Sequence, residues 1–155
     1  IELNVVDGII LPNLKMAGAE DGCGFLTEEG RCGIHPFRPG ICRLFPLGRY
    51  YEENGFRYFL QVHECQKENR AKVKVKKWLD TPDLKKYEAY IARWHGLLIQ
   101  LQEYIAAHPE SAKAVSMDVL QRFYLTPYHT EEFYSEFKKY ANMTVEEYFN
   151  LVWAK

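Results

Sequence analysis

The sequence lacks the features that mark several classes of protein. It contains no long uncharged apolar run, which excludes a helix that spans a membrane. Its formal net charge is only -1, so no excess of one sign favours nucleic acid or an anionic membrane as a partner. Four cysteines in 155 residues are far too few for a fold built from disulfides. With 47% hydrophobic and 15% aromatic residues, the chain has the composition of a globular domain.

The motifs of common catalytic sites are also missing from the sequence. It has no glycine-rich phosphate loop, no nucleophile elbow and no His-Glu-x-x-His motif. No Gly-x-Gly motif follows a strand, which excludes an S-adenosylmethionine site of the Rossmann type. The chain opens on Ile1 without the basic leader and cleavage site of a signal peptide. We therefore expect it to start inside a longer protein, with room for further cysteine ligands upstream of Ile1.

The composition of the chain changes near residue 80. All four cysteines precede this position, and Gly96 is the only glycine that follows it. Short, turn-rich, strand-like segments come before the change, and long helical patterns come after it. We therefore predict an α+β protein. Residues 1–80 would form irregular cysteine-bearing loops with a β-hairpin, and residues 81–155 a helical segment packed on them.

Strands are expected at three places before residue 80. Residues 8–11 predict a short buried strand that ends at Pro12. Residues 48–52 and 56–62 predict the two strands of a hairpin. The intervening Asn54-Gly55 supplies the positive φ angles that a tight hairpin turn needs.

Helical periodicity governs the rest of the chain. Residues 71–79 predict a helix with one apolar face, and Thr81-Pro82 predicts the start of the next one. From there, apolar residues recur at three- and four-residue steps, which predicts a helix of about six turns ending near His108-Pro109. The dense aromatic residues between Phe123 and Trp153 are expected to form core between packed helices. Further helices are expected around residues 113–124, around residues 131–140 and from Thr144 onward.

The four cysteines follow the spacing Cys-x8-Cys-x9-Cys-x22-Cys, at Cys23, Cys32, Cys42 and Cys65. Metal knuckles usually carry Cys-x2-Cys, because a tight turn then aims two thiolates at one ion, so this spacing alone is a weak metal signal. The stretch from Cys32 to Pro46 contains three prolines and two glycines, which prevent regular structure and stiffen the loop. A rigid loop suits preorganised ligands, although cysteines are also common as buried thiols or in disulfides.

The motif around the cysteines is more specific than their spacing. It comprises Gly22-Cys23-Gly24-Phe25-Leu26, Cys32-Gly33-Ile34-His35, Arg38-Pro39, Cys42-Arg43 and Phe45-Pro46, with Cys65 after the hairpin. This pattern resembles the YkgJ-type cysteine-cluster family, described as zinc- or iron-chelating domains, and the resemblance covers roughly residues 1–80. His35 stands where the family more often has tyrosine. The family's earlier Cys-x2-Cys-x3-Cys-Cys cluster is not in this sequence.

The resemblance implies a site in which thiolates hold a metal ion or cluster and guanidinium groups set its charge: Cys23, Cys32, Cys42 and Cys65, with Arg38 and Arg43. It implies an iron–sulfur cluster as cofactor, with zinc as the alternative, in a cytoplasmic bacterial protein. The family includes flagellin lysine N-methylases, which implies a protein substrate and leaves open whether this chain is an enzyme. The competing hypothesis is a non-enzymatic structural zinc module whose helical tail binds a partner. A third treats the cysteines as structural, without metal.

Two other features invite a functional interpretation. His63 lies two residues before Cys65 and is a candidate substitute ligand, although a histidine at a strand end is more often simply half exposed. The run from Lys67 to Lys77 has six basic residues, as an RNA- or phosphate-binding stripe would. Because Lys72 and Lys76 lie opposite the apolar face of the predicted helix, we expect a solvated face and no nucleic-acid partner.

Overall fold

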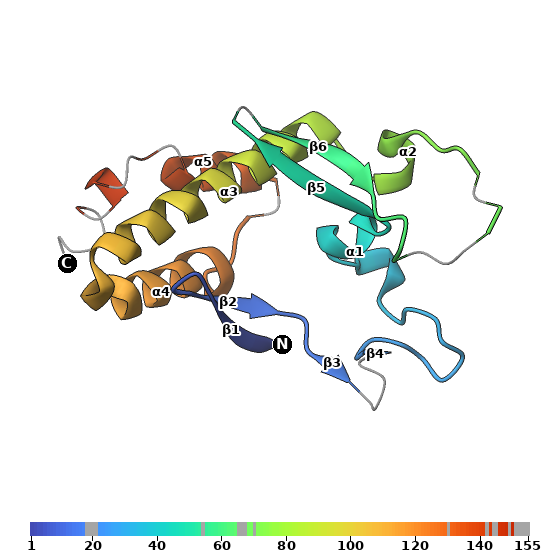
Figure 1. The fold of residues 1–155 in the computed structure, drawn as a ribbon, viewed down its shortest axis with the longest axis horizontal. Coiled ribbons are helices and arrows are strands. Elements are labelled where there is room, and N and C mark those ends of the chain that lie inside the picture. The colour runs from blue at the N-terminus through green and yellow to red at the C-terminus, as the bar shows by residue number, and fades with distance from the viewer. Residues whose placement is uncertain are drawn as a thin grey trace. The chain divides into compact units, whose positions relative to one another are not determined.

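The computed structural model describes most of the chain: residues 1–17, 22–53, 55–64, 68–69, 71–129, 131–141, 143, 146–148 and 150. Cys65 and the helix start predicted at Thr144 lie outside these ranges. Antiparallel hairpins and helices make up the structure, so the predicted α+β class is confirmed (Figure 1). Among the described helices, none is both long enough and apolar enough to cross a membrane.

The chain divides into two compact units. Residues Ile1–Gly24 and Arg93–Lys155 form one, called here the helical unit, and Phe25–Ala92 form the other, called here the cysteine unit. The composition changes near residue 80, whereas these packing boundaries follow residues 24 and 92. The N-terminal residues group with the helices because Ile9 is fully buried in the same core as Leu97 and Leu101.

The helical unit opens with a hairpin that the sequence pattern only partly indicated. Strand β1 (Glu2–Val6) pairs antiparallel with β2 (Ile9–Asn13), and Val6 faces Ile9 across a two-residue turn. The turn residues Asp7 and Gly8 have φ angles of 46° and 86°. Asp-Gly is a favoured pair for this turn, because both positions need positive φ.

The predicted end of the second strand at Pro12 is wrong, since β2 continues to Asn13. In an antiparallel pair, the N–H groups of residues two apart point to the same edge. Ile10 donates its N–H outward to Ser116 Oγ at 3.1 Å. The nitrogen of Pro12 therefore also faces outward, and the missing N–H removes no bond between the strands.

The helices that follow residue 83 end close to the predicted positions. Helix α3 (Leu84–Ala107) stops just before His108-Pro109, as predicted, and a 3₁₀ turn (Pro109–Ser111) leads into α4 (Ala112–Leu120). A π-helical turn (Gln121–Leu125) continues α4, and α5 (Phe133–Ala141) follows. The buried core consists of Ile9, Leu97, Leu101, Ile105, Val115, Val119 and Tyr148.

Aromatic rings extend this core, as the sequence predicts for the described residues. The ring centroid of Trp94 lies 4.9 Å from that of Phe123, 6.0 Å from Tyr124 and 6.1 Å from Phe137. Phe137 is 3% exposed. Rings at these distances and angles form favourable edge or tilted pairs, so the aromatic density of the tail is explained by packing between helices.

Gly8 provides a direct test of how the first hairpin packs. A Cβ at Gly8 would lie 2.9 Å from Cγ2 of the buried Ile105, in addition to adopting a φ of +86°. We expect Gly8→Ala to lower the free energy of unfolding by about 2–4 kcal/mol, from backbone strain plus overpacking. Urea unfolding followed by tryptophan fluorescence measures this change.

The matched control for that substitution is Gly30→Ala. Gly30 has a φ of +71°, but nothing lies within 4 Å of a Cβ built there. The control should therefore show backbone strain alone, about 1–2 kcal/mol. Equal losses in the two variants would mean that the hairpin does not press on Ile105.

The cysteine unit contains the hairpin predicted from Asn54-Gly55. Strand β5 (Leu47–Glu52) pairs antiparallel with β6 (Gly55–Leu60), and Glu52 faces Gly55 at the turn. The hairpin is thus confirmed, although β6 ends two residues earlier than predicted and Asn54 lies outside the described residues. Gly55 has a φ of +128°, a conformation that glycine adopts without strain.

The helix predicted for residues 71–79 is shorter than expected. Helix α2 comprises Val75–Leu79, and residues 71–74 are not helical. Leu79 is its one fully buried residue, and a short helix is marginal where no packing supports it. Lys72 and Lys76 are both exposed, but Lys72 precedes the helix, so the two do not share a helical face.

The start predicted for the following helix at Thr81-Pro82 is also wrong. Asp80 ends α2 in the left-handed conformation with a φ of 46°, and Thr81 Oγ1 donates back to the carbonyl of Leu79 at 3.2 Å. Asp83 has a φ of 47°, so α3 begins after it, at Leu84. Two aspartates in left-handed geometry separate the helices, and single aspartates tolerate this conformation better than most residues.

Candidate metal centre

Each described cysteine is held in a different local structure. Cys23 ends the short strand β4 (Gly22–Cys23), which pairs antiparallel with β3 (Met16–Ala17), and its side chain is half buried. It belongs to the helical unit, whereas Cys32 and Cys42 belong to the cysteine unit. Cys23 and Cys32 are free thiols in this structure.

Cys32 lies at the end of a tight loop that brings the chain back beside Phe25 and Leu26, as the turn-forming Gly30 predicts. Thr27 donates its N–H to the carbonyl of Arg31 at 2.8 Å, and Gly33 donates to that of Phe25 at 2.8 Å. A β-bridge joins Leu26 to Cys32. These bonds fix the backbone on both sides of the half-buried thiol.

Cys42 lies in the short helix α1 (Gly40–Leu44), which follows a 3₁₀ turn (His35–Phe37), and its side chain is exposed. The hydroxyl of Tyr87 would lie 2.5 Å from a Cβ on Gly40. A side chain at this position would therefore force Tyr87 to move. The same hydroxyl accepts a hydrogen bond of 2.9 Å from Arg49 Nη2.

Arg43 has a structural role that the sequence did not reveal. Its Nη1 donates to the carbonyl of Asp80 at 3.1 Å, and its Nη2 donates to that of Pro36 at 3.4 Å. In addition, Trp78 Nε1 donates to the carbonyl of Phe45 at 3.1 Å. The loop that carries Cys42 is thus fastened to α2 and to the residue that ends it.

Arg38 keeps an unused donor within the described part of the chain. Its Nη1 lies 2.8 Å from Nε2 of the exposed His35, whereas its buried Nε has no hydrogen-bond partner among the described residues. Between Glu29 and Glu52 the sequence has four arginines and no acidic residue. The segment that contains Cys32 and Cys42 therefore carries only positive formal charge.

The described residues do not complete a metal site by themselves. Within the ranges given above, no group of three or more His, Cys, Asp or Glu side chains is arranged to hold a metal ion. Cys65 lies outside these ranges, and His63, two residues before it in sequence, is exposed. The assignment of all four cysteines as ligands therefore stays a prediction.

The cysteine unit has very few buried apolar side chains. Among its described residues, Leu44 and Leu79 have the only buried large apolar side chains, with 5% and 1% of their surfaces exposed. Large apolar side chains beside the cysteines are instead exposed, including Phe37 at 86% and Ile41 at 61%. A unit of this size with so small a core usually depends on a disulfide or a metal for stability.

The structure also contains a cavity that the sequence did not predict. It lies in the helical unit, beside the π-helical turn and α5, and has a volume of about 320 Å³. Its polar residues form no sequence motif, because separate segments of the chain contribute them. The one local signal was Thr126-Pro127, which ends the helical pattern abruptly.

No family profile, curated protein or solved structure compared with this chain matches it. The likeness to the YkgJ type therefore depends on the cysteine motif and its arginines alone.

Proposed function

We propose that this chain is a cysteine-ligated metal- or iron–sulfur-cluster-binding protein of the YkgJ type. The ligands are the four thiolates of the motif, and Arg38 and Arg43 lie in the same loops. An iron–sulfur cluster is the first candidate, and zinc is the alternative. Four thiolates suit either group, since both accept a tetrahedral arrangement of sulfur.

The observation that carries this proposal is the small core of the cysteine unit. Two buried leucines and a few half-buried aromatic side chains offset only part of the conformational entropy that the described residues of this unit lose on folding. A metal held by residues far apart in sequence supplies this missing free energy, as it does in zinc fingers. A metal would stabilise the loops of Cys32 and Cys42 most, because the apolar side chains near these cysteines are exposed and contribute little packing.

The charge around the cysteines also supports ligation over a disulfide. Cys32 is a free thiol, and the segment between Glu29 and Glu52 carries only positive formal charge. Positive charge in the loops that hold a metal offsets the negative charge that several thiolate ligands bring to it. A disulfide needs no such compensation, because its sulfurs are neutral.

The second candidate is a non-enzymatic structural zinc module, with a helical segment that binds a protein partner. The small core favours it equally, since structural zinc contributes directly to folding. Methyl transfer to a protein lysine extends the first candidate by resemblance alone. The two candidates differ in a simple observable: a cluster gives colour and acid-labile sulfide, whereas zinc gives neither.

Cys42→Ser tests the ligand assignment at a single residue. We expect the variant to lose most of its bound metal and to unfold at a lower urea concentration, because serine does not replace a thiolate ligand. Metal content per chain after anaerobic purification is the measurement. Lys74→Ala is the control, since Lys74 is exposed and precedes α2.

The comparison between these two variants is decisive for Cys42. The control should keep the metal content and stability of the unmodified protein. If Cys42→Ser also keeps both, Cys42 is not a ligand.

A further inference from the structure

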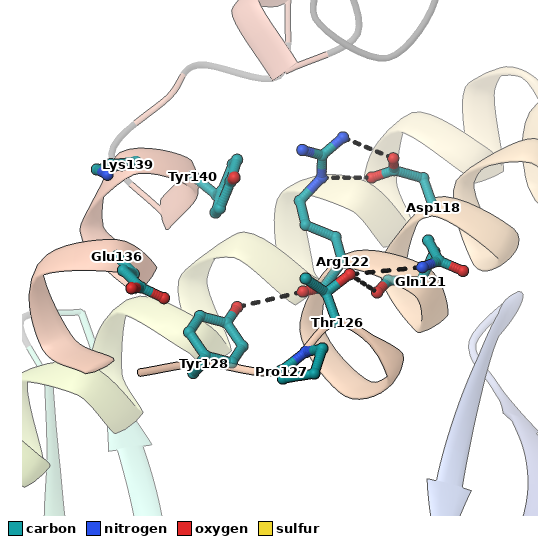
Figure 2. Close-up of a pocket in the computed structure, with 9 residues that line it drawn as sticks. All are labelled: Asp118, Gln121, Arg122, Thr126, Pro127, Tyr128, Glu136, Lys139 and Tyr140. Carbon is teal, nitrogen blue, oxygen red and sulfur yellow. Dashed lines mark hydrogen bonds and ion pairs between the residues drawn. The ribbon is translucent and has the colours of Figure 1, made fainter. Parts of the chain in front are cut away.

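The cavity of the helical unit has the size and the lining of a small-molecule site. Its volume of about 320 Å³ lies in the range of ligand pockets, and its walls come from the π-helical turn, the segment after it and α5 (Figure 2). All of its lining residues belong to the helical unit. π-helical turns occur frequently at functional sites, because they displace side chains from the regular helical pattern.

Arg122 forms the cationic wall of the cavity and is held firmly. Its Nε and Nη2 donate to the two carboxylate oxygens of Asp118 at 3.0 and 2.7 Å, and its guanidinium lies 4.7 Å from the ring centroid of Tyr140. The hydroxyl of the buried Tyr148 also donates to Asp118. Figure 2 shows Asp118 on the side of Arg122 away from α5, while the remaining nitrogen, Nη1, is directed toward Tyr140.

Glu136 and Tyr128 add a carboxylate and a phenol to the lining, and the Tyr128 hydroxyl donates to the carbonyl of Arg122 at 3.3 Å. The Glu136 side chain is only 20% exposed and lies on α5 on the same side of the cavity as Tyr128 (Figure 2). Glu136 accepts a hydrogen bond of 2.8 Å from Nδ1 of the largely exposed His129. Burial, with Tyr140 and Glu136 nearby, raises the pKa of Tyr128, so its hydroxyl stays protonated at neutral pH.

Lys139 lies one turn after Glu136 on α5 and also lines the cavity. It forms no ion pair with any described residue. The lining therefore contains two carboxylates and two cations, and one of each is already paired in the Asp118–Arg122 contact. Because the lining carries both signs, a ligand with one positive and one negative group finds an oppositely charged side chain for each.

We propose that this cavity binds a small zwitterion, a free α-amino acid. Its carboxylate lies toward Arg122 and Lys139, and its ammonium group lies toward Glu136 and the face of Tyr128. Guanidinium groups bind carboxylates well, and an aromatic face beside a carboxylate suits an ammonium group. This site is independent of the cysteines, so its test does not depend on the metal.

The test begins with thermal shift measurements of the full chain against each of the twenty L-amino acids at millimolar concentration. The best binder is then compared by calorimetry with its amide, which keeps only the ammonium, and with its N-acetyl form, which keeps only the carboxylate. We expect each derivative to bind roughly tenfold more weakly or worse, because each loses a charge-assisted hydrogen bond. If no amino acid binds, or if either derivative binds as well as the parent, the proposal is wrong.

Two variants with neighbouring controls locate the binding. Glu136→Gln and Lys139→Met should each weaken the best binder by roughly tenfold or more. Glu131→Gln and Lys138→Met should leave its affinity unchanged, since Glu131 and Lys138 are exposed and do not line the cavity. Full affinity in both cavity variants, measured on protein that unfolds at the normal urea concentration, would place the ligand elsewhere and overturn the proposal.

Discussion

Removal of the bound metal or cluster is expected to unfold the cysteine unit and to leave the core of the helical unit folded. Structural zinc in zinc-finger peptides contributes about 10–16 kcal/mol, far more than the burial of two leucines supplies. The core around Leu101 and Val119 contains no cysteine, so it does not depend on the metal. Hydrogen exchange before and after treatment with a chelator measures both units in one experiment.

The exchange rates of amides in individual strands and helices distinguish the two units. After chelation, amides of β5 and β6 should exchange rapidly, whereas those of α4 should stay protected. The same chelator saturated with calcium is the control and should change neither. Unchanged protection of β5 and β6, once loss of the metal is verified, would show that the metal does not hold the cysteine unit together.

Asp118→Ala is the second substitution with a large expected effect. The Asp118 carboxylate accepts two hydrogen bonds from Arg122 and one from Tyr148, and only 16% of its side chain is exposed. Alanine would leave a guanidinium and a phenol without their partner in a mostly buried place. We expect a loss of about 3 kcal/mol in the free energy of unfolding, measured by urea titration with tryptophan fluorescence.

The control for this prediction is an exposed ion pair. Glu52 lies 3.1 Å from Arg57 Nε, and the two side chains are 50% and 68% exposed. Glu52→Ala should therefore change stability by at most about 1 kcal/mol. Equal effects of the two substitutions would mean that Asp118 is more solvated than its contacts indicate, and that Arg122 is not fixed in the cavity wall.

Much of the fold was predictable because its signals are local. Asn54-Gly55 marks the hairpin of the cysteine unit, and the spacing of apolar residues marks α3 almost to its last residue. The wrong predictions concern places where tertiary structure decides the local conformation. Pro12 stays in its strand because its nitrogen faces away from the partner strand, and residues 71–74 are not helical because no packing supports them.

The candidate site was predictable in part, for a related reason. Its cysteines and arginines lie in one stretch of sequence, where proline and glycine mark the irregular loops. The contacts that shape these loops come from far along the chain. Tyr87 packs on Gly40, and Arg43 reaches Asp80, so neither role was apparent from the motif. The cavity beside α5 is assembled in the same way and left no motif at all.

The account depends above all on the claim that the cysteines bind a metal or cluster. Iron, zinc and acid-labile sulfide should be measured together on protein purified without oxygen. We predict a brown protein with iron and sulfide in matching amounts, or, under the alternative, a colourless protein with one zinc per chain. A folded protein that contains none of the three would contradict the central claim in both forms.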